Sequence, residues 1–234
     1  MKRLILILFL PFLAAADQGE LARDKTALAP LQRYVGDWRG VGQPRRGSTR
    51  GAWREKSAWI WKFVDGKAML SFASAGGKYF ETGVLRPEKR AKYYELVAQT
   101  GAGKEVKFRG GLSEDGRLVL VADKPPASGP ARVSLRQVAN GDRLVVLYER
   151  RTSANRYARL AEVGYTREGS NFGKGTNYVE CVVTGGLGTI AVSHEGKTYY
   201  VCCSGCRDYF NENAVEVLAE YRERKAAEKA KQQE

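Results

Sequence analysis

Residues 28–40 have the sequence LAPLQRYVGDWRG, and this segment decides the fold that we expect. Residues 28–35 are expected to form a short helical turn. Gly36, Asp37 and Trp38 follow at once and open a run with strand character. The segment therefore predicts a helical turn that leads directly into a first β-strand beginning with a Gly-x-Trp motif.

Beyond this opening, the sequence continues to about Arg167 as short β-rich or alternating runs separated by turn signals. Asp65-Gly66, Gly76-Gly77 and Asn140-Gly141-Asp142 are typical of hairpin connections. No segment with helical periodicity interrupts the runs. Many short strands at regular spacing predict an antiparallel barrel or sandwich, and a closed barrel is favoured because it leaves no exposed edge. The expected later strands are 52–64, 67–74, 79–85, 93–98, 106–109, 118–122, 133–138, 144–149 and 157–165.

Residues 28–167 resemble the calycins, the lipocalin and fatty-acid-binding-protein-like barrels, in the Gly-x-Trp opening and in the number of strands. In that group the tryptophan closes one end of the barrel, and a basic residue late in the chain stacks on it. The resemblance implies that Arg167 stacks on Trp38 through a cation–π contact.

A calycin-like barrel can also hold a ligand. Trp53, Trp59 and Trp61 lie at odd positions of one β run and therefore share a face. They are candidates for lining a cavity that takes a small lipid-like or anionic molecule. Ordinary core packing is the alternative for these three residues.

The N-terminus predicts export. Lys2 and Arg3 precede an apolar run from Leu4 to Ala15, and Ala14-Ala15-Ala16 then supplies a small-residue cleavage site. This order is typical of a secretory signal peptide. The run is shorter than the roughly 20 residues that span a bilayer, although an uncleaved membrane anchor is an alternative. We therefore expect a periplasmic or secreted protein.

The formal net charge is +13 at pH 7, and the basic residues are spread over the whole sequence. A surplus of this size attracts anionic surfaces. Nucleic acid is not expected as a partner of an exported protein, whereas anionic surfaces of the cell envelope are. Solubility alone also explains a charge of this size.

All four cysteines lie between Cys181 and Cys206. An even number of cysteines in an exported protein suggests disulfides, which is one reading of this segment. The other is a metal site. Residues 190–193 and 197–201 are expected to form a hairpin, followed by a helix with an expected interruption at residues 211–213. Thiolates at a strand-to-helix junction are suited to soft ions such as zinc or copper(I).

The spacing Cys181-x20-Cys202-x3-Cys206, with Tyr199-Tyr200 before and Tyr209-Phe210 after, resembles the TRASH/YHS domain, a metal-sensing or metal-handling module. The resemblance covers about residues 177–220. It implies that Cys181, Cys202 and Cys206 are the metal ligands. Cys203 departs from the pattern and is expected either to replace Cys202 or to serve as a fourth ligand. Other candidates for the fourth position are Asp208, Glu180, water and, less favourably placed at the hairpin tip, His194.

These observations predict a mainly β protein with a signal peptide at 1–16, a calycin-like barrel at 17–167, a linker at 168–177, a TRASH/YHS-like module at 178–221 and a charged helical tail at 222–234. The expected function is soft-metal binding, and the alternative is a small-molecule binder with a structural cysteine module. With one histidine in the chain and no phosphate-binding loop or dinucleotide fingerprint, we expect no enzyme. A catalytic pair drawn from Glu81, Glu95 and Glu149, facing the barrel interior, is the third alternative.

Overall fold

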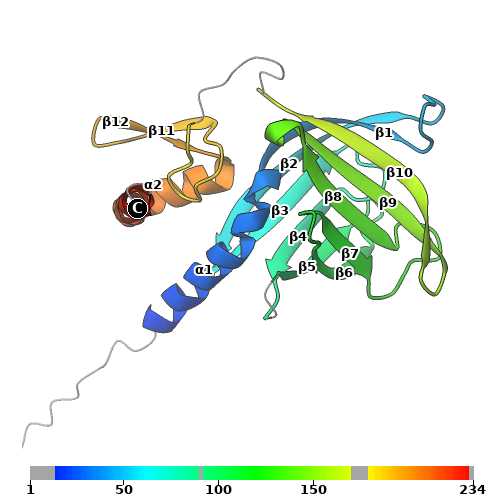
Figure 1. The fold of residues 1–234 in the computed structure, drawn as a ribbon, viewed down its shortest axis with the longest axis horizontal. Coiled ribbons are helices and arrows are strands. Elements are labelled where there is room, and N and C mark those ends of the chain that lie inside the picture. Colours follow the sequence, from blue (N-terminus) through cyan, green and yellow to red (C-terminus); the bar gives the residue numbers. More distant parts are fainter. Residues whose placement is uncertain (1–13, 90–91, 170–178, 232–234) are drawn as a thin grey trace, which may run out of the picture.

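The computed structural model describes residues 14–89, 92–169 and 179–231. Ten antiparallel strands, each paired with its neighbours in sequence, form a closed barrel in which β1 also pairs with β10 (Figure 1). The strands are β1 (Gly36–Gln43), β2 (Trp53–Val64), β3 (Lys67–Ala75), β4 (Thr82–Pro87), β5 (Tyr93–Gln99), β6 (Glu105–Leu112), β7 (Leu118–Ala122), β8 (Arg132–Val138), β9 (Arg143–Ser153) and β10 (Arg156–Arg167). The expected fold class is confirmed.

One strand begins later in the structure than the sequence predicted. The run 79–85 was predicted to be extended throughout, but β4 begins only at Thr82. Tyr79 and Phe80 instead fold over the barrel interior, where their rings lie 4.8 Å and 6.1 Å from the ring of Tyr148. Their apolar character therefore reflects packing inside the barrel and not a place in the sheet.

The Gly-x-Trp motif closes one end of the barrel, as the resemblance to calycins implied. Trp38 is buried, and the Arg167 guanidinium lies 4.2 Å from the centre of its ring. Arg167 also donates hydrogen bonds to the carbonyl oxygens of Val35 at 2.6 Å and Arg33 at 2.8 Å. These contacts tie the last barrel strand to the helical turn before the first strand.

Two helical elements precede β1 and cover this closed end. They are α1 (Ala14–Leu28) and the 3-10 helix η1 (Ala29–Tyr34). Leu28, Leu31 and Tyr34 are fully buried. The Tyr34 hydroxyl donates to the carbonyl of Leu135 at 3.1 Å, so the cap is joined to the barrel by hydrogen bonds as well as by apolar contact.

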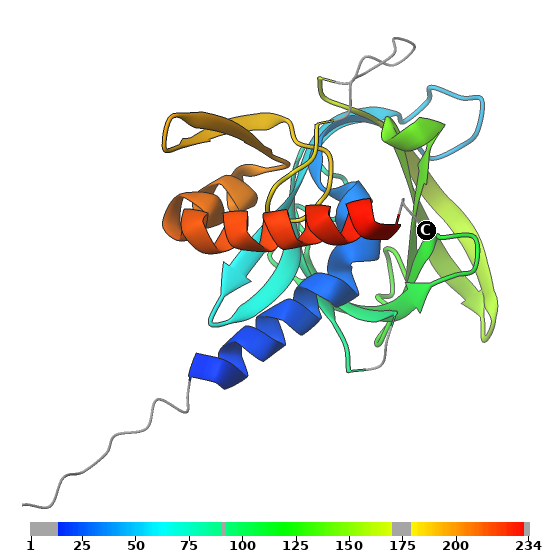
Figure 2. The ribbon, with the colours of Figure 1, turned by 60° about the vertical axis from the view of Figure 1, so that its left-hand side comes forward.

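The cysteine-containing segment forms a separate two-stranded sheet, β11 (Ile190–His194) and β12 (Lys197–Val201), followed by the long helix α2 (Ser204–Lys231). The hairpin and helix were both expected. Asn213 has a non-helical backbone conformation, and α2 bends there, within the predicted interruption (Figure 2). The second half of α2 passes α1, where Lys25 pairs with Glu220 at 2.6 Å.

The barrel and this module share one hydrophobic core. Beyond Trp59, the last residue of β2 that pairs with β1, the strand continues with one edge unpaired on that side. The start of α2 packs against this edge. The Trp61 backbone N–H points to the Cys203 sulfur at 3.4 Å, and the tilted rings of Phe63 and Tyr209 pack with their centroids 4.3 Å apart. The free edge of β2 is thus covered by the cysteine module.

Several predicted features fall on residues outside the described ranges. They include most of the signal peptide and most of the linker, so both stay predictions. Among the residues that are described, no helix combines the length and the apolar character needed to cross a membrane.

Candidate metal centre

Cys181 lies in a tight backbone turn. Its N–H donates to the carbonyl of Gly186 at 2.6 Å, and its carbonyl accepts from the N–H of Gly185 at 2.8 Å. Gly185 has a φ of +76°, a conformation that glycine adopts without a steric penalty. The Val182 N–H then joins the turn to β12 by donating to Tyr200 at 2.9 Å. The turn therefore holds Cys181 against the end of β12.

The other three cysteines lie where β12 gives way to α2. Cys202 and Cys203 come directly before the helix, and Cys206 is in its first turn. The Cys203 carbonyl accepts the first helical hydrogen bond, from Arg207 at 3.0 Å. The N-terminus of a helix carries a partial positive charge that favours thiolates over thiols.

The fold brings Cys181, Cys202 and Cys206 together. Their three sulfur atoms all lie within 4.8 Å of one another, and those of Cys202 and Cys206 are 3.5 Å apart. All four cysteines are free thiols in this structure. Because Zn–S bonds are about 2.3 Å long, sulfurs on one tetrahedral ion are about 3.8 Å apart, so the spacing is suitable for a shared metal ion. That these residues bind a metal stays a prediction.

Cys203 differs from the other three in its contacts. Its sulfur is 3.9 Å from that of Cys202, but it lies outside the mutual 4.8 Å cluster. Instead it accepts the hydrogen bond from the Trp61 backbone on the barrel. Thr184 lies closer to the cluster, with its hydroxyl 3.3 Å from the Cys181 sulfur and 3.6 Å from the Cys202 sulfur. The geometry therefore gives Cys203 a role at the interface with the barrel.

The cluster is buried, with Cys181 and Cys206 fully inaccessible to solvent. Hydrogen bonds from the Cys202 and Cys206 thiols lower the pKa of Cys181 to about 2. Burial raises the pKa of Cys206 well above its ordinary value, and the neighbouring Cys181 sulfur does the same for Cys202. Three sulfurs this close cannot all be ionised without a cation. Hydrogen bonds from the same two thiols also lower the pKa of Cys203, to about 4.

The remaining fourth-ligand candidates lie away from the cluster. His194 is at the hairpin tip, where its ring packs edge-on against Phe210 with the centroids 6.3 Å apart. Asp208 is exposed and paired with its neighbour Arg207 at 2.9 Å. Neither belongs to the group of ligand atoms that the described structure brings together.

Glu180 and Arg224 form the outer support of the Cys181 turn. The Arg224 side chain donates to the Glu180 carboxylate at 3.1 Å and to the carbonyl of Val182 at 3.1 Å. Lys225 pairs with the same carboxylate at 3.0 Å. The second half of α2 therefore holds the turn that carries Cys181, and it can do so because α2 bends at Asn213.

We predict that Arg224→Met lowers metal affinity about 10- to 100-fold, the usual effect of removing an outer contact, while the number of bound ions is unchanged. Competition with a chromophoric chelator measures the affinity. Arg222→Met is the matched control, because Arg222 is exposed on the same helix and has no ion pair within the described ranges. An equal loss in both variants would show that Arg224 acts only through charge.

The barrel interior was the site of the alternative function. Trp53, Trp59 and Trp61 do face inward, as expected from their spacing, but they lie at different depths. Trp59 borders a cavity of about 20 Å³. Trp61 packs at the closed end near Cys203, and Trp53 lies towards the open end beside Tyr79. This cavity has room for about one water molecule, whereas ligand pockets are usually several hundred Å³.

The interior also holds a carboxylate that sequence reasoning missed. Glu55 is buried on the face shared by the three tryptophans, and its carboxylate accepts hydrogen bonds from the Trp53 ring N–H at 2.5 Å and from the Tyr165 hydroxyl. Burial raises the pKa of Tyr165 well above its ordinary value, so this hydroxyl stays a donor. The odd-numbered position of Glu55 within the tryptophan run was an available signal.

The acidic residues that were expected to line the barrel interior point outward instead. Glu95 pairs with Arg109 at 2.8 Å on the outer surface, and Glu149 is covered by Arg132 at 2.6 Å. Glu81 is exposed just before β4. The strand alternation that places Leu96 and Tyr148 inside puts their neighbours outside, so the predicted pair is not present.

No protein-family model matches the chain, and no curated protein matches it. A solved structure titled "Crystal Structure of Rv2717c from M. tuberculosis" aligns with a TM-score of 0.42 and 21% sequence identity, over 61% of this chain and 97% of that chain. A likeness at this level says nothing about what this chain binds.

Proposed function

We propose that this chain is an exported protein that binds a soft metal ion, zinc or copper(I), through Cys181, Cys202 and Cys206. Its role is metal sensing, buffering or delivery, not catalysis. The observation that carries the proposal is the convergence of these three buried sulfurs within 4.8 Å, from two segments 20 residues apart. Burying three free thiols around one point has little value for packing alone, and soft ions prefer sulfur ligands.

Further support comes from the resemblance of residues 177–220 to the TRASH/YHS domain and from the signal-peptide-like N-terminus. The competing function, a small apolar or anionic ligand in the barrel, has weaker support. The cavity lined by Trp59 is about 20 Å³, and the buried Glu55 carboxylate makes the interior unfavourable for an anion.

The test is a metal count on the chain after export to an oxidising compartment, by elemental mass spectrometry, with a free-thiol assay on the same sample. We expect about one soft metal ion per chain, with the cluster thiols reactive only after chelation. A metal-free chain with no reactive thiols would mean that the cysteines form disulfides, and it would end the proposal.

Metal binding is expected to strengthen as pH rises. The raised pKa values keep Cys202 and Cys206 protonated near neutral pH, so a metal ion must displace two protons, whereas the lowered pKa of Cys181 leaves it ionised. Apparent affinity should therefore increase on the order of 100-fold per pH unit through this range. Chelator competition at several pH values measures the slope, and an affinity independent of pH would contradict it.

A further inference from the structure

The fold gathers exposed arginines at the open end of the barrel, although they are far apart in the sequence. They come from the β1–β2 connection with the start of β2, and from the tip of the β9–β10 hairpin. Because β1 pairs with both β2 and β10, the two hairpins lie at the same end. Arg159 joins them by donating to the carbonyl of Gln43 at 3.2 Å. The exposed members are Arg45, Arg46, Arg50, Arg54, Arg150, Arg151 and Arg156.

These seven arginines, here called the mouth arginines, carry charge that the described part of the chain does not neutralise. None of them has an ion pair there, and segments 44–54 and 150–160 contain no acidic residue. By contrast, the exposed Arg109 pairs with three carboxylates, from Glu88, Glu95 and Asp123. Arg151 does contact the Tyr157 hydroxyl at 3.3 Å, but within the described ranges no carboxylate pairs with any of the mouth arginines.

Their chemistry favours phosphate groups. Arginine is the only basic residue type in segments 44–54 and 150–160, and the planar guanidinium forms paired hydrogen bonds with phosphate oxygens. Val41, which lies opposite Arg54 in the β1–β2 pairing, is 47% exposed. An apolar side chain among basic ones suits the boundary between lipid headgroups and acyl chains.

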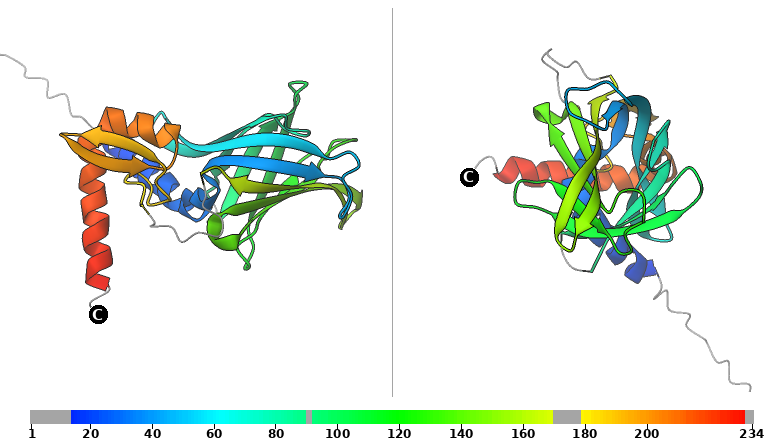
Figure 3. Two further views of the ribbon diagram at one scale, coloured as in Figure 1. Left: turned by 90° about the horizontal axis from the view of Figure 1, so that it is seen from above. Right: turned by 90° about the vertical axis from the view of Figure 1, so that its right-hand side faces the viewer.

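The arrangement also suits a flat partner. The tips of the two hairpins project from the end of the barrel that lies away from α2 and the β11–β12 sheet, as two views of the ribbon show (Figures 1 and 3). A surface in contact with this end leaves the cysteine module on the far side. A nucleic acid or peptide would instead require a continuous groove or stripe, and the charges are on two separate tips.

We propose that the mouth arginines form a docking surface for an anionic lipid bilayer, with the barrel standing on the membrane and the cysteine module directed away from it. The contact consists of guanidinium groups bound to lipid phosphates. This inference is independent of the metal site, because it concerns the opposite end of the molecule.

Co-sedimentation with vesicles of phosphatidylcholine, with and without phosphatidylglycerol, tests the proposal at physiological ionic strength. The chain is used without the predicted signal peptide, so that its apolar run does not itself insert. We expect binding only to vesicles that contain phosphatidylglycerol. Each basic residue at an anionic surface contributes about fivefold to affinity. We therefore expect a loss on the order of 100-fold in each of two triple variants, R45Q/R46Q/R50Q and R150Q/R151Q/R156Q.

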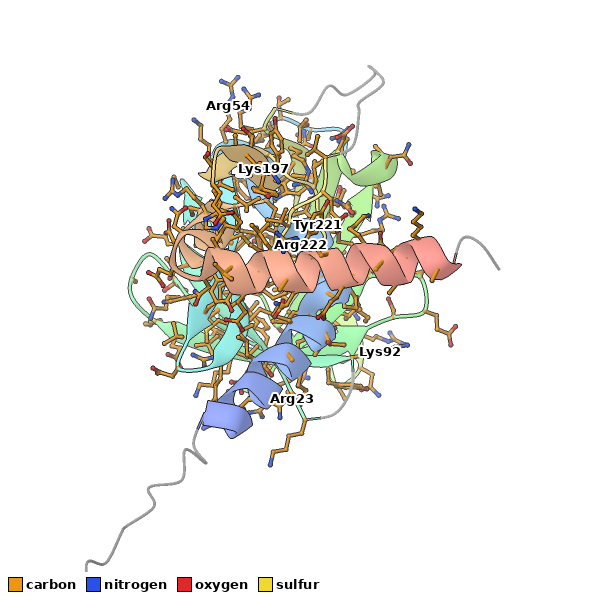
Figure 4. All side chains as sticks on the ribbon, turned by 90° about the vertical axis from the view of Figure 1, so that its left-hand side faces the viewer. Arg23, Arg54, Lys92, Lys197, Tyr221 and Arg222 are labelled. Carbon is orange, nitrogen blue, oxygen red and sulfur yellow. The ribbon has the colours of Figure 1, made fainter. Side chains whose placement is uncertain are left out.

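The matched control removes three positive charges at the other end. K67Q/K92Q/R222Q changes exposed residues near the closed end and on α2, two of which, Lys92 and Arg222, are labelled in Figure 4. Charges that lie more than a Debye length of about 8 Å from the contact are screened, so the control should lose no more than about threefold.

Four results would overturn the proposal. Equal losses in all three variants would mean that net charge alone attracts the chain. Failure of the unaltered chain to bind anionic vesicles would rule out the lipid surface. Displacement by inorganic phosphate would assign the arginines to a soluble anion. Binding to single-stranded nucleic acid that is tighter than binding to vesicles would assign them to a polymer.

Discussion

Replacing Cys181 by serine is expected to abolish stoichiometric metal binding while the barrel still folds. Cys181 is one of the three sulfurs in the mutual cluster of the described structure, and it is the member of that cluster whose pKa is lowered. The metal-binding free energy of a structural thiolate site is about 10 to 16 kcal/mol, and three or four ligands share it. Losing one ligand should therefore weaken metal affinity on the order of 1000-fold or more. Elemental mass spectrometry measures the loss, and circular dichroism checks that the barrel is retained.

Cys203→Ser is the control for this experiment, because it places the same hydroxyl in a buried cysteine position of the same module. Its sulfur lies outside the cluster and accepts a hydrogen bond from Trp61. We expect Cys203→Ser to keep one metal ion per chain and to keep the rise in melting temperature that a bound ion gives. If Cys203→Ser loses the ion and Cys181→Ser retains it, the assignment of the ligands is wrong.

The barrel could be predicted from sequence because its signals are local. Strand alternation and hairpin turns are read within ten or so residues, and they gave the number of strands and the closed sheet. The contact between Trp38 and Arg167 is long-range, and it was expected only through the resemblance to calycins. The error at Tyr79 and Phe80 has a physical cause, because an apolar run inside a barrel loop has the same local pattern as a strand.

The cysteine cluster was predictable in outline, but not the different position of Cys203. Spacing placed Cys202 and Cys206 at the strand-to-helix junction, and the structure does the same. What separates Cys203 from them is the free edge of β2, whose Trp61 N–H needs an acceptor. No pattern within residues 178–221 contains that information, because the partner lies 142 positions earlier.

Glu55 shows the same limit inside the barrel. Its inward direction could be read from the alternation of the tryptophan run, but its partners depend on β1. A side chain at Gly40 would come within 2.5 Å of the Tyr165 ring, and one at Gly42 within 2.2 Å of the Trp53 ring. Because these two positions are glycines, both rings have room to reach the Glu55 carboxylate. The partners of Glu55 can therefore be predicted only when the β1–β2 pairing is known.

Gly205→Ala is expected to disrupt the junction between the barrel and the cysteine module. A Cβ at position 205 would lie 1.7 Å from the Trp61 carbonyl oxygen and 2.8 Å from its carbonyl carbon. Both are backbone atoms of β2, so no side-chain rotation can relieve the overlap and the start of α2 must move. Overpacking usually costs about 1–3 kcal/mol, and a clash with backbone atoms should reach the upper part of that range. Urea denaturation measures the loss of unfolding free energy.

The same displacement should reach the metal cluster, because Gly205 lies between Cys203 and Cys206 in the first turn of α2. We expect metal affinity to fall about 10-fold or more with the three ligands intact. Gly19→Ala is the control, since a Cβ there meets no other atom within 4 Å and alanine favours the helix. If Gly205→Ala is as stable as Gly19→Ala and binds metal equally well, then α2 does not dock on Trp61 as described.

The cluster would then be a property of the module alone, and deleting the barrel should leave metal binding unchanged. A loss of both stability and affinity in Gly205→Ala would instead mean that the edge of β2 is part of what holds the cysteines in place.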